Sequence, residues 1–161
     1  MKFSGVPAFV PVMVIGVFLA LLIIISLEAR EPSAAPRGDI ILFIEGFRND
    51  RGKALLALYD SPEFYPEDSR KAILLRKAAI KNGRVEIILR DNLWGRYALS
   101  ILHDENNNGR MDRSFLGIPR EGYGLLENTV PRKRAQRFEE QAFILTTDTL
   151  HLRHSIYYGK P

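Results

Sequence analysis

Short apolar runs alternate with turn-forming residues along most of the chain, and this pattern predicts β-strands. In segment 84–90, Val85, Ile87 and Leu89 would face one side of a sheet while Glu86 faces the other. Strands are predicted by the same reasoning over residues 39–47, 53–59, 69–81, 84–90, 97–103, 138–146 and 149–157.

Turn signals between these runs predict how the strands are joined. Asn49–Gly52 predicts pairing of the two runs that flank it, and Asn82-Gly83 predicts a two-residue hairpin between segments 69–81 and 84–90. Segment 69–81 also suits a helix, and residues 104–137 are predicted to be mainly loop. Together the runs indicate an all-β fold, a single antiparallel β-sandwich of about seven strands.

The beginning of the chain has a different pattern. No charged residue lies between Lys2 and Glu28, and the run from 6 to 27 is almost wholly apolar. Such a run is long enough for a hydrophobic helix that spans a bilayer, and longer than the apolar part of a usual signal peptide. A buried core helix is disfavoured because the run has no polar face. We therefore expect residues 6–27 to contact a membrane.

This run divides the chain into three parts. We expect a signal anchor or signal peptide over 1–29, a linker over 30–37, and the β-sandwich domain over 38–158. Alanines at 29 and 35 permit cleavage, so both alternatives stay open. The expected location is the inner membrane with the domain in the periplasm, or the periplasm itself if the segment is cleaved.

Composition excludes several chemistries. The chain has no cysteine, which rules out disulfides, thiolate metal sites and a cysteine nucleophile. The net charge of +4 is too modest to indicate nucleic-acid binding. Ser114, His103 and Asp104 are the residue types of a hydrolase, but they crowd into one loop with nothing to form an oxyanion hole. We expect a protein that is not an enzyme.

One loop has the residue spacing of a cation site. Asp104, Asn106 and Asn108 place side-chain oxygens at alternate positions, Arg110 offers its backbone carbonyl, and Asp112 follows. This spacing matches the first nine positions of an EF-hand loop, and a hard cation such as Ca²⁺ takes six to eight oxygen ligands. The sequence predicts a structural calcium site at 104–112.

The match to a calcium loop is incomplete. Phe115 stands where an EF-hand has a bidentate Glu, and the side chains of Arg110 and Arg113 oppose a cation. Glu121 is a candidate to complete the ligand shell from the next loop. Asp, Asn and Gly are also the usual residues of turns whose side chains bond their own backbone, so a metal-free turn explains the pattern equally well.

Three segments together resemble a known bacterial family. They are Gly95-Arg96-Tyr97-Ala98, His103 through Asp112, and Phe115 through Gly124. The chain resembles, over about residues 38–158, the uncharacterised exported proteins of domain of unknown function 2141, and also transthyretin-like and carboxypeptidase-regulatory-like sandwiches. The resemblance implies an exported β-sandwich with no established activity. The sequence departs from the family at Leu125–Asn128, where the family continues with Phe-Ser-Asn-Asn.

A second candidate surface is the glycine-rich stretch 117–124. With Trp94 it suggests a module that binds a carbohydrate or another envelope ligand, although such a stretch often only packs a tyrosine onto a sheet. The basic cluster 132–134 with Arg137 is either a solvated loop or a contact for lipid headgroups. An envelope protein or glycan is the expected partner.

Overall fold

The computed structural model describes residues 34–132 and 134–159. The chain divides into two compact units, Met1–Ala35 and Pro36–Pro161, and the second holds the entire sheet and its core. A unit of this size with a core of its own is expected to fold without the first unit. The hydrophobic helix predicted over 6–27 lies outside the described residues. Within them, no helix is long and apolar enough to cross a membrane.

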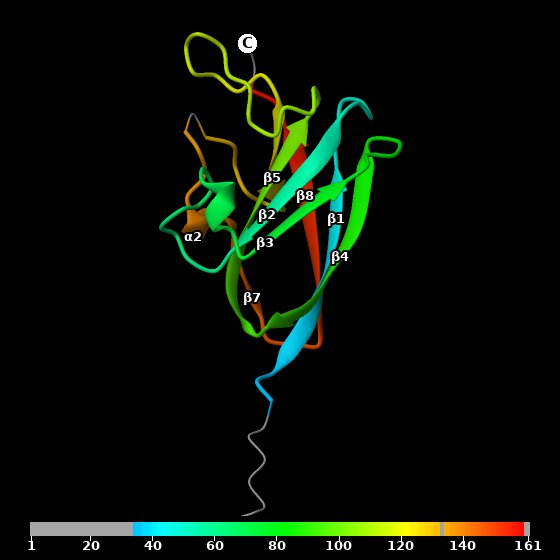
Figure 1. Ribbon diagram of the computed structural model, residues 1–161, viewed down its shortest axis with the longest axis vertical. Helices are drawn as coiled ribbons and strands as arrows, with labels where there is room; N and C mark the ends of the chain where they lie inside the picture. The colour runs from blue at the N-terminus through cyan, green and yellow to red at the C-terminus, as the bar shows by residue number, and fades with distance from the viewer. Residues whose placement is uncertain (1–33, 133, 160–161) are drawn as a thin grey trace, which may run out of the picture. The chain divides into compact units, whose positions relative to one another are not determined.

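The domain is all-β, as predicted, with two short helical segments (Figure 1). Its strands are β1 (Arg37–Glu45), β2 (Lys53–Tyr59), β3 (Leu74–Ala78), β4 (Arg84–Leu93), β5 (Gly95–Asp104), β6 (Gly122–Leu126), β7 (Ala142–Leu145) and β8 (Thr149–Tyr157). The helical segments are a 3₁₀ turn, η1 (Ser69–Lys71), and one turn of α-helix, α2 (Phe138–Gln141).

The strands form one connected sheet in the order β3-β2-β5-β6-β8-β1-β4, with β7 paired to β5. The connection between β5 and β6 is narrow, because only Leu102–Tyr123 and His103–Gly122 are paired there. Side chains from both sides of this connection meet in one core, so the sheet folds over on itself. The two ends of the order, β3 and β4, are joined by the short 79–83 connection, and the sheet nearly closes.

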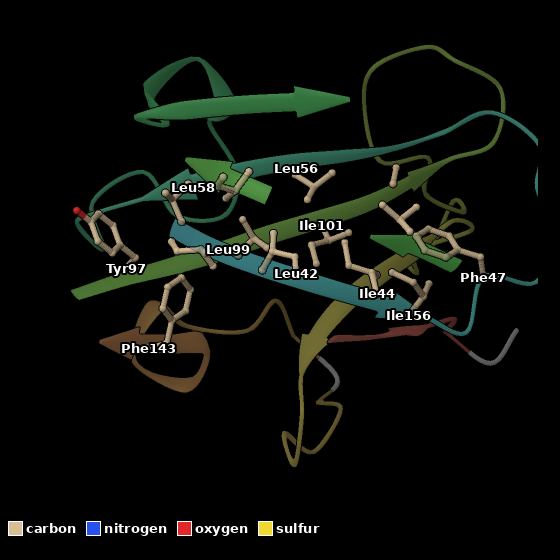
Figure 2. Close-up of a cluster of buried hydrophobic side chains, with 14 of the residues drawn as sticks. Leu42, Ile44, Phe47, Leu56, Leu58, Tyr97, Leu99, Ile101, Phe143 and Ile156 are labelled. Atoms are coloured by element: carbon tan, nitrogen blue, oxygen red, sulfur yellow. The ribbon is translucent and has the colours of Figure 1, made fainter. Parts of the chain in front are cut away.

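The core follows from the alternation of side chains along each strand. Leu42 and Ile44 of β1 point toward Leu99 and Ile101 of β5 from the opposite side of the core (Figure 2). The fully or almost fully buried apolar residues are Ile40, Leu42, Ile44, Ala54, Leu56, Leu58, Leu89, Ala98, Leu99, Ile101 and Leu145. Burial of this set is the main stabilising contribution to the fold.

The predicted pairing of the first two strands is wrong. β1 pairs with β4 in antiparallel fashion and with β8 in parallel fashion, whereas β2 pairs with β3 and β5. The turn at Asn49–Gly52 reverses the chain but carries it from one side of the core to the other. The turn residues encode the reversal and not the partner strand. The β1·β8 pair also corrects the expectation of a purely antiparallel fold.

The Asn82-Gly83 turn forms, but the hairpin it predicts is only one residue pair long. Asn82 and Gly83 have φ of 53° and 70°, and the backbone N–H groups of Lys81 and Arg84 each donate to the other's carbonyl at 3.0 and 3.1 Å. Beyond this pair the chain separates toward β3 and β4, which lie at opposite ends of the strand order.

Residues 104–137 are mainly loop, as predicted, but Gly122–Leu126 form an additional strand, β6, between β5 and β8. One further prediction near the end of the chain needs correction. The predicted strand 138–146 is the helical turn α2 followed by β7. Glu140 caps this helical turn by accepting the backbone N–H of Arg137 at 2.8 Å, which favours helix at the start of the segment.

Candidate functional site

The candidate site lies at the end of the domain where β5 finishes. Residues 105–121 connect β5 to β6 and project from this end (Figure 1, yellow-green). The other end of β5 begins beside Trp94, whose backbone N–H donates to the carbonyl of Pro36 at 2.9 Å. A ten-residue strand spans about 30 Å. The loop therefore projects from the end of the domain opposite Pro36, where the domain begins.

Asp104 folds the first part of this loop. The residue is only 2% exposed, and its two carboxylate oxygens accept the backbone N–H groups of Asn108 at 3.0 Å and Gly109 at 2.9 Å. Gly109 has φ of +78°, the left-handed conformation that glycine adopts without strain. Asn106 and Asn108 continue the turn, since their side-chain oxygens accept the backbone N–H groups of Asn108 and Arg110.

Three of the predicted ligands meet at one point. The side-chain amide nitrogen of Asn106 donates to Asp112 Oδ2 at 2.7 Å, and that of Asn108 donates to Asp112 Oδ1 at 2.9 Å. Asp104 is linked to this point through the backbone of Asn108. Arg110 takes part through its backbone, while its side chain is exposed.

The donor chemistry suits a hard cation only weakly. Two carboxylates, two neutral amides and a backbone carbonyl supply oxygens, but the amide groups of Asn106 and Asn108 turn their nitrogens toward Asp112. A half-turn of each amide would present oxygens instead, but it would break the hydrogen bonds that these oxygens accept from the backbone N–H groups of Asn108 and Arg110. Lys53, paired with Asp104 across β2 and β5, adds a nearby positive charge. Among residues 34–132 and 134–159, no three His, Asp or Glu side chains are grouped closely enough to hold a metal.

Glu121 holds the two ends of the loop together. It is 4% exposed, and its oxygens accept the backbone N–H groups of Glu105 at 2.9 Å and Asp112 at 3.0 Å. Glu121 therefore stabilises the loop through the backbone, in place of the ligand role considered from the sequence. A buried carboxylate satisfied by two backbone donors is a strong constraint on loop conformation.

The buried His103, at the end of β5, and the half-buried Tyr158 form a hydrogen-bonded group next to the loop. The Tyr158 hydroxyl accepts the backbone N–H of Arg48 at 3.0 Å and is hydrogen-bonded to Nδ1 of His103 at 2.6 Å. The other ring nitrogen of His103 donates to the carbonyl of Arg51 at 2.9 Å. Sequence reasoning missed Tyr158, because it lies beyond the predicted last strand and its partners are far away in the chain.

Glu105 links the loop to the turn between β1 and β2 by an ion pair and a hydrogen bond. Its carboxylate contacts the guanidinium of Arg48 as an ion pair and accepts the side-chain amide of Asn49 at 3.0 Å. Burial acts to raise the pKa of Glu105, but the hydrogen bonds from Asn49 and Arg48 and the charge of Arg48 outweigh it, so the pKa lies below its usual value.

The residues considered for a hydrolase do not assemble as a triad. The ring nitrogens of His103 contact Tyr158 and Arg51, and the carboxylate oxygens of Asp104 accept backbone N–H groups. The Ser114 hydroxyl accepts the backbone N–H of Ile118 at 3.2 Å. These polar atoms hold the local fold.

The two parts of the second candidate surface, the 117–124 stretch and Trp94, lie apart in the structure. Gly122 and Gly124 are buried in β6, and a side chain at Gly122 would collide with Ile156 and Tyr158. Only residues 117–121 of the predicted 117–124 loop are loop. Trp94 lies beside Pro36, at the opposite end of β5. The stretch and the tryptophan therefore do not form one ligand site.

The basic cluster is partly engaged with an acidic residue. Arg132 and Arg134 contact the Glu140 carboxylate at 3.0 and 2.7 Å. The hydrogen bond from Arg134, the backbone N–H of Arg137 and the two positive charges lower the pKa of Glu140 to about 2. This arrangement agrees better with a solvated, internally paired loop than with a free basic patch.

Comparison with known protein families shows which family the chain belongs to. The profile of a family described as "Uncharacterized protein conserved in bacteria (DUF2141)" matches residues 43–152. The chain belongs to this family. The DUF2141 match starts in β1 and ends in β8, so it includes the whole 105–121 loop and Asp104. No significant match was found among curated proteins or among solved structures.

Proposed function

We propose that this DUF2141 protein is a non-enzymatic interaction module, anchored in the inner membrane by residues 6–27 with its sandwich-like domain in the periplasm. Its loop 104–112 binds Ca²⁺ as a structural ion. The observation that carries the calcium proposal is the convergence of Asn106, Asn108 and Asp112 at the centre of a turn closed by Asp104.

The tight turn of the loop supports the proposal. Asp104 accepts the backbone N–H of Gly109, and a cation would have to reorient the amides of Asn106 and Asn108, whose oxygens accept backbone N–H groups of the loop. Two carboxylates supply little charge, and Lys53 opposes the ion. We therefore expect a dissociation constant in the weak range of extracellular modules, about 10⁻⁴ to 10⁻³ M.

Calcium titration of the 36–161 domain tests this proposal. We expect Ca²⁺ to raise the melting temperature and to give a saturable calorimetric isotherm, because the ion binds the folded loop and not the unfolded chain. Asp112→Ala should abolish both responses. The matched control is Asp148→Ala, an exposed acidic residue in the turn between β7 and β8, which should keep both. No response up to about 10 mM Ca²⁺, or an equal response in Asp112→Ala, would show that the loop is a metal-free turn.

A second candidate function is binding of an envelope glycan. The observation in its favour is that Tyr123 of β6 and Tyr157 of β8 pack edge to face, with ring centroids 5.5 Å apart, and both side chains are half-buried rather than enclosed. Aromatic faces at a surface are suited to sugar rings. Sedimentation of the domain with insoluble envelope polysaccharide, compared between wild type and Tyr123→Ala, tests this candidate. Equal sedimentation of the two proteins would remove it.

A further inference from the structure

The outer part of the 105–121 loop is a small ordered hairpin, residues 112–120, which we call the tip hairpin. The backbone N–H of Arg120 donates to the carbonyl of Asp112 at 2.8 Å, and that of Ser114 donates to the carbonyl of Ile118 at the same distance. Gly117, with φ of +77°, closes the turn by donating to the carbonyl of Ser114 at 2.9 Å. The tip is therefore held in one conformation by its own backbone.

This hairpin presents two apolar side chains to solvent. Phe115 is 101% exposed and Leu116 is 78% exposed, the highest values among the large hydrophobic residues of the described chain. Single exposed apolar residues are common on protein surfaces. Here two neighbours stand together on a convex, ordered turn, where the domain itself offers nothing to cover them. Such an arrangement indicates that a partner supplies the apolar surroundings.

The exposed charges around the tip are positive. Arg110, Arg113 and Arg120 are all exposed, and Arg113 and Arg120 flank the turn on its two strands. The carboxylates of this loop point inward: Asp104 and Glu121 are buried on backbone N–H groups. Asp112 accepts the two asparagine amides, and Glu105 is paired with Arg48 and Arg51. A partner at the tip therefore meets apolar groups surrounded by arginines.

We infer that the tip hairpin inserts Phe115 and Leu116 into the surface of an anionic lipid bilayer, with Arg113 and Arg120 at the headgroup phosphates. This inference rests on the proposed function, because it names the partner of the same loop. A bilayer accepts a convex apolar turn without a matching pocket, and its anionic headgroups complement the arginines. A soluble anion would satisfy only the arginines and would leave both apolar side chains in water.

Fluorescence of a tryptophan placed at the tip tests insertion directly. The experiment uses the 36–161 domain, so that the predicted anchor does not contribute, and a Trp94→Phe background, so that Phe115→Trp provides the only tryptophan. Vesicles of equal parts phosphatidylcholine and phosphatidylglycerol should shift the emission to the blue, and lipids with brominated acyl chains should quench it. A tryptophan at Ile144, an exposed residue of β7, is the matched control and should show neither effect.

Sedimentation with the same vesicles measures the contribution of each group. Phe115→Asp should reduce partitioning by roughly tenfold or more, since burial of one large apolar side chain is worth at least that factor. Ile144→Asp should leave partitioning unchanged. Binding should weaken with added salt and on vesicles of phosphatidylcholine alone, because the arginine contribution is electrostatic.

Two results would overturn the inference. One is failure of the wild-type domain to bind anionic vesicles, which would leave a protein pocket as the partner of the tip. The other is binding that Phe115→Asp leaves intact, which would mean adsorption by charge alone. The calcium titration separates this inference from the proposed function. Neither tip variant alters the 104–112 ligands, so an intact calcium response with no vesicle binding would reject the lipid partner and keep the calcium site.

Discussion

His154 in β8 provides the sharpest test of the packing. The residue is 1% exposed and faces the core, and its neighbours in register on β1 and β6 are the apolar residues Ile44 and Leu126. Neither ring nitrogen has a hydrogen-bond partner within the described residues. Burial without a partner disfavours the charged form and lowers the pKa of His154 from 6.5 to about 4.

This change in pKa makes stability depend on pH in a defined direction. Well above the ordinary histidine pKa of 6.5 the residue is neutral in both states and has no effect on the pH dependence. As the pH falls toward 4, the unfolded chain binds a proton that the folded protein does not, so the folded state loses stability. The full difference corresponds to roughly 3 kcal/mol, most of it reached by about pH 4.5. Glu105 and Glu140, with lowered pKa values, lose their contributions only at lower pH.

Urea unfolding of the 36–161 domain between about pH 7 and about pH 4.5 measures this loss. His154→Leu should remove most of the pH dependence in that interval. It should also be at least as stable as the wild type at neutral pH, because it replaces an unsatisfied buried polar group. His151→Gln, on the same strand but exposed, is the control and should keep the wild-type profile. If wild type and His154→Leu lose stability in parallel, His154 is not buried as a neutral, unpartnered group and the reasoning is refuted.

Two further substitutions test the support of the loop. Glu121→Gln should lower the free energy of unfolding by about 1–3 kcal/mol, because it weakens the acceptor of two backbone N–H groups, whereas Glu127→Gln on the surface should change little in the same urea titration. Tyr158→Phe should lower the free energy of unfolding by about 1–2 kcal/mol, because it removes the hydroxyl that joins His103 to the backbone N–H of Arg48. The control Tyr157→Phe should stay near wild type. Equal effects of the two substitutions would contradict the role of the Tyr158 hydroxyl.

The strands themselves were predictable because burial follows alternation. Segments 53–59 and 149–157 were predicted with the bounds that β2 and β8 have in the structure, and segment 84–90 lies within β4. Strand partners were not predictable, since an apolar strand is equally satisfied by several neighbours. β6 was missed because Gly122 and Gly124 have low strand propensity, and only the tertiary structure shows that their lack of side chains admits Ile101, Ile156 and Tyr158.

The candidate loop was predictable in part, for a local reason. Asp104, Asn106 and Asn108 bond backbone groups within a few residues, so their spacing alone indicates the turn. The role of Glu121 depends on a return of the chain after sixteen positions, and no local pattern encodes it. The burial of His154 was equally hidden, because the sequence shows only that it and His151 occupy opposite faces of a strand.

The parallel pairing of β1 with β8 has a mechanical consequence. The first and last strands of the domain lie side by side over seven residue pairs, from Asp39–Thr149 to Glu45–Ser155, and they enter and leave at opposite ends. A pulling force applied between Pro36 and Tyr158 acts along this ladder. It loads the hydrogen bonds between the two strands together, in shear, instead of opening them one at a time. A domain tethered at its beginning and held at its far end would therefore resist extension through this uninterrupted ladder of seven residue pairs.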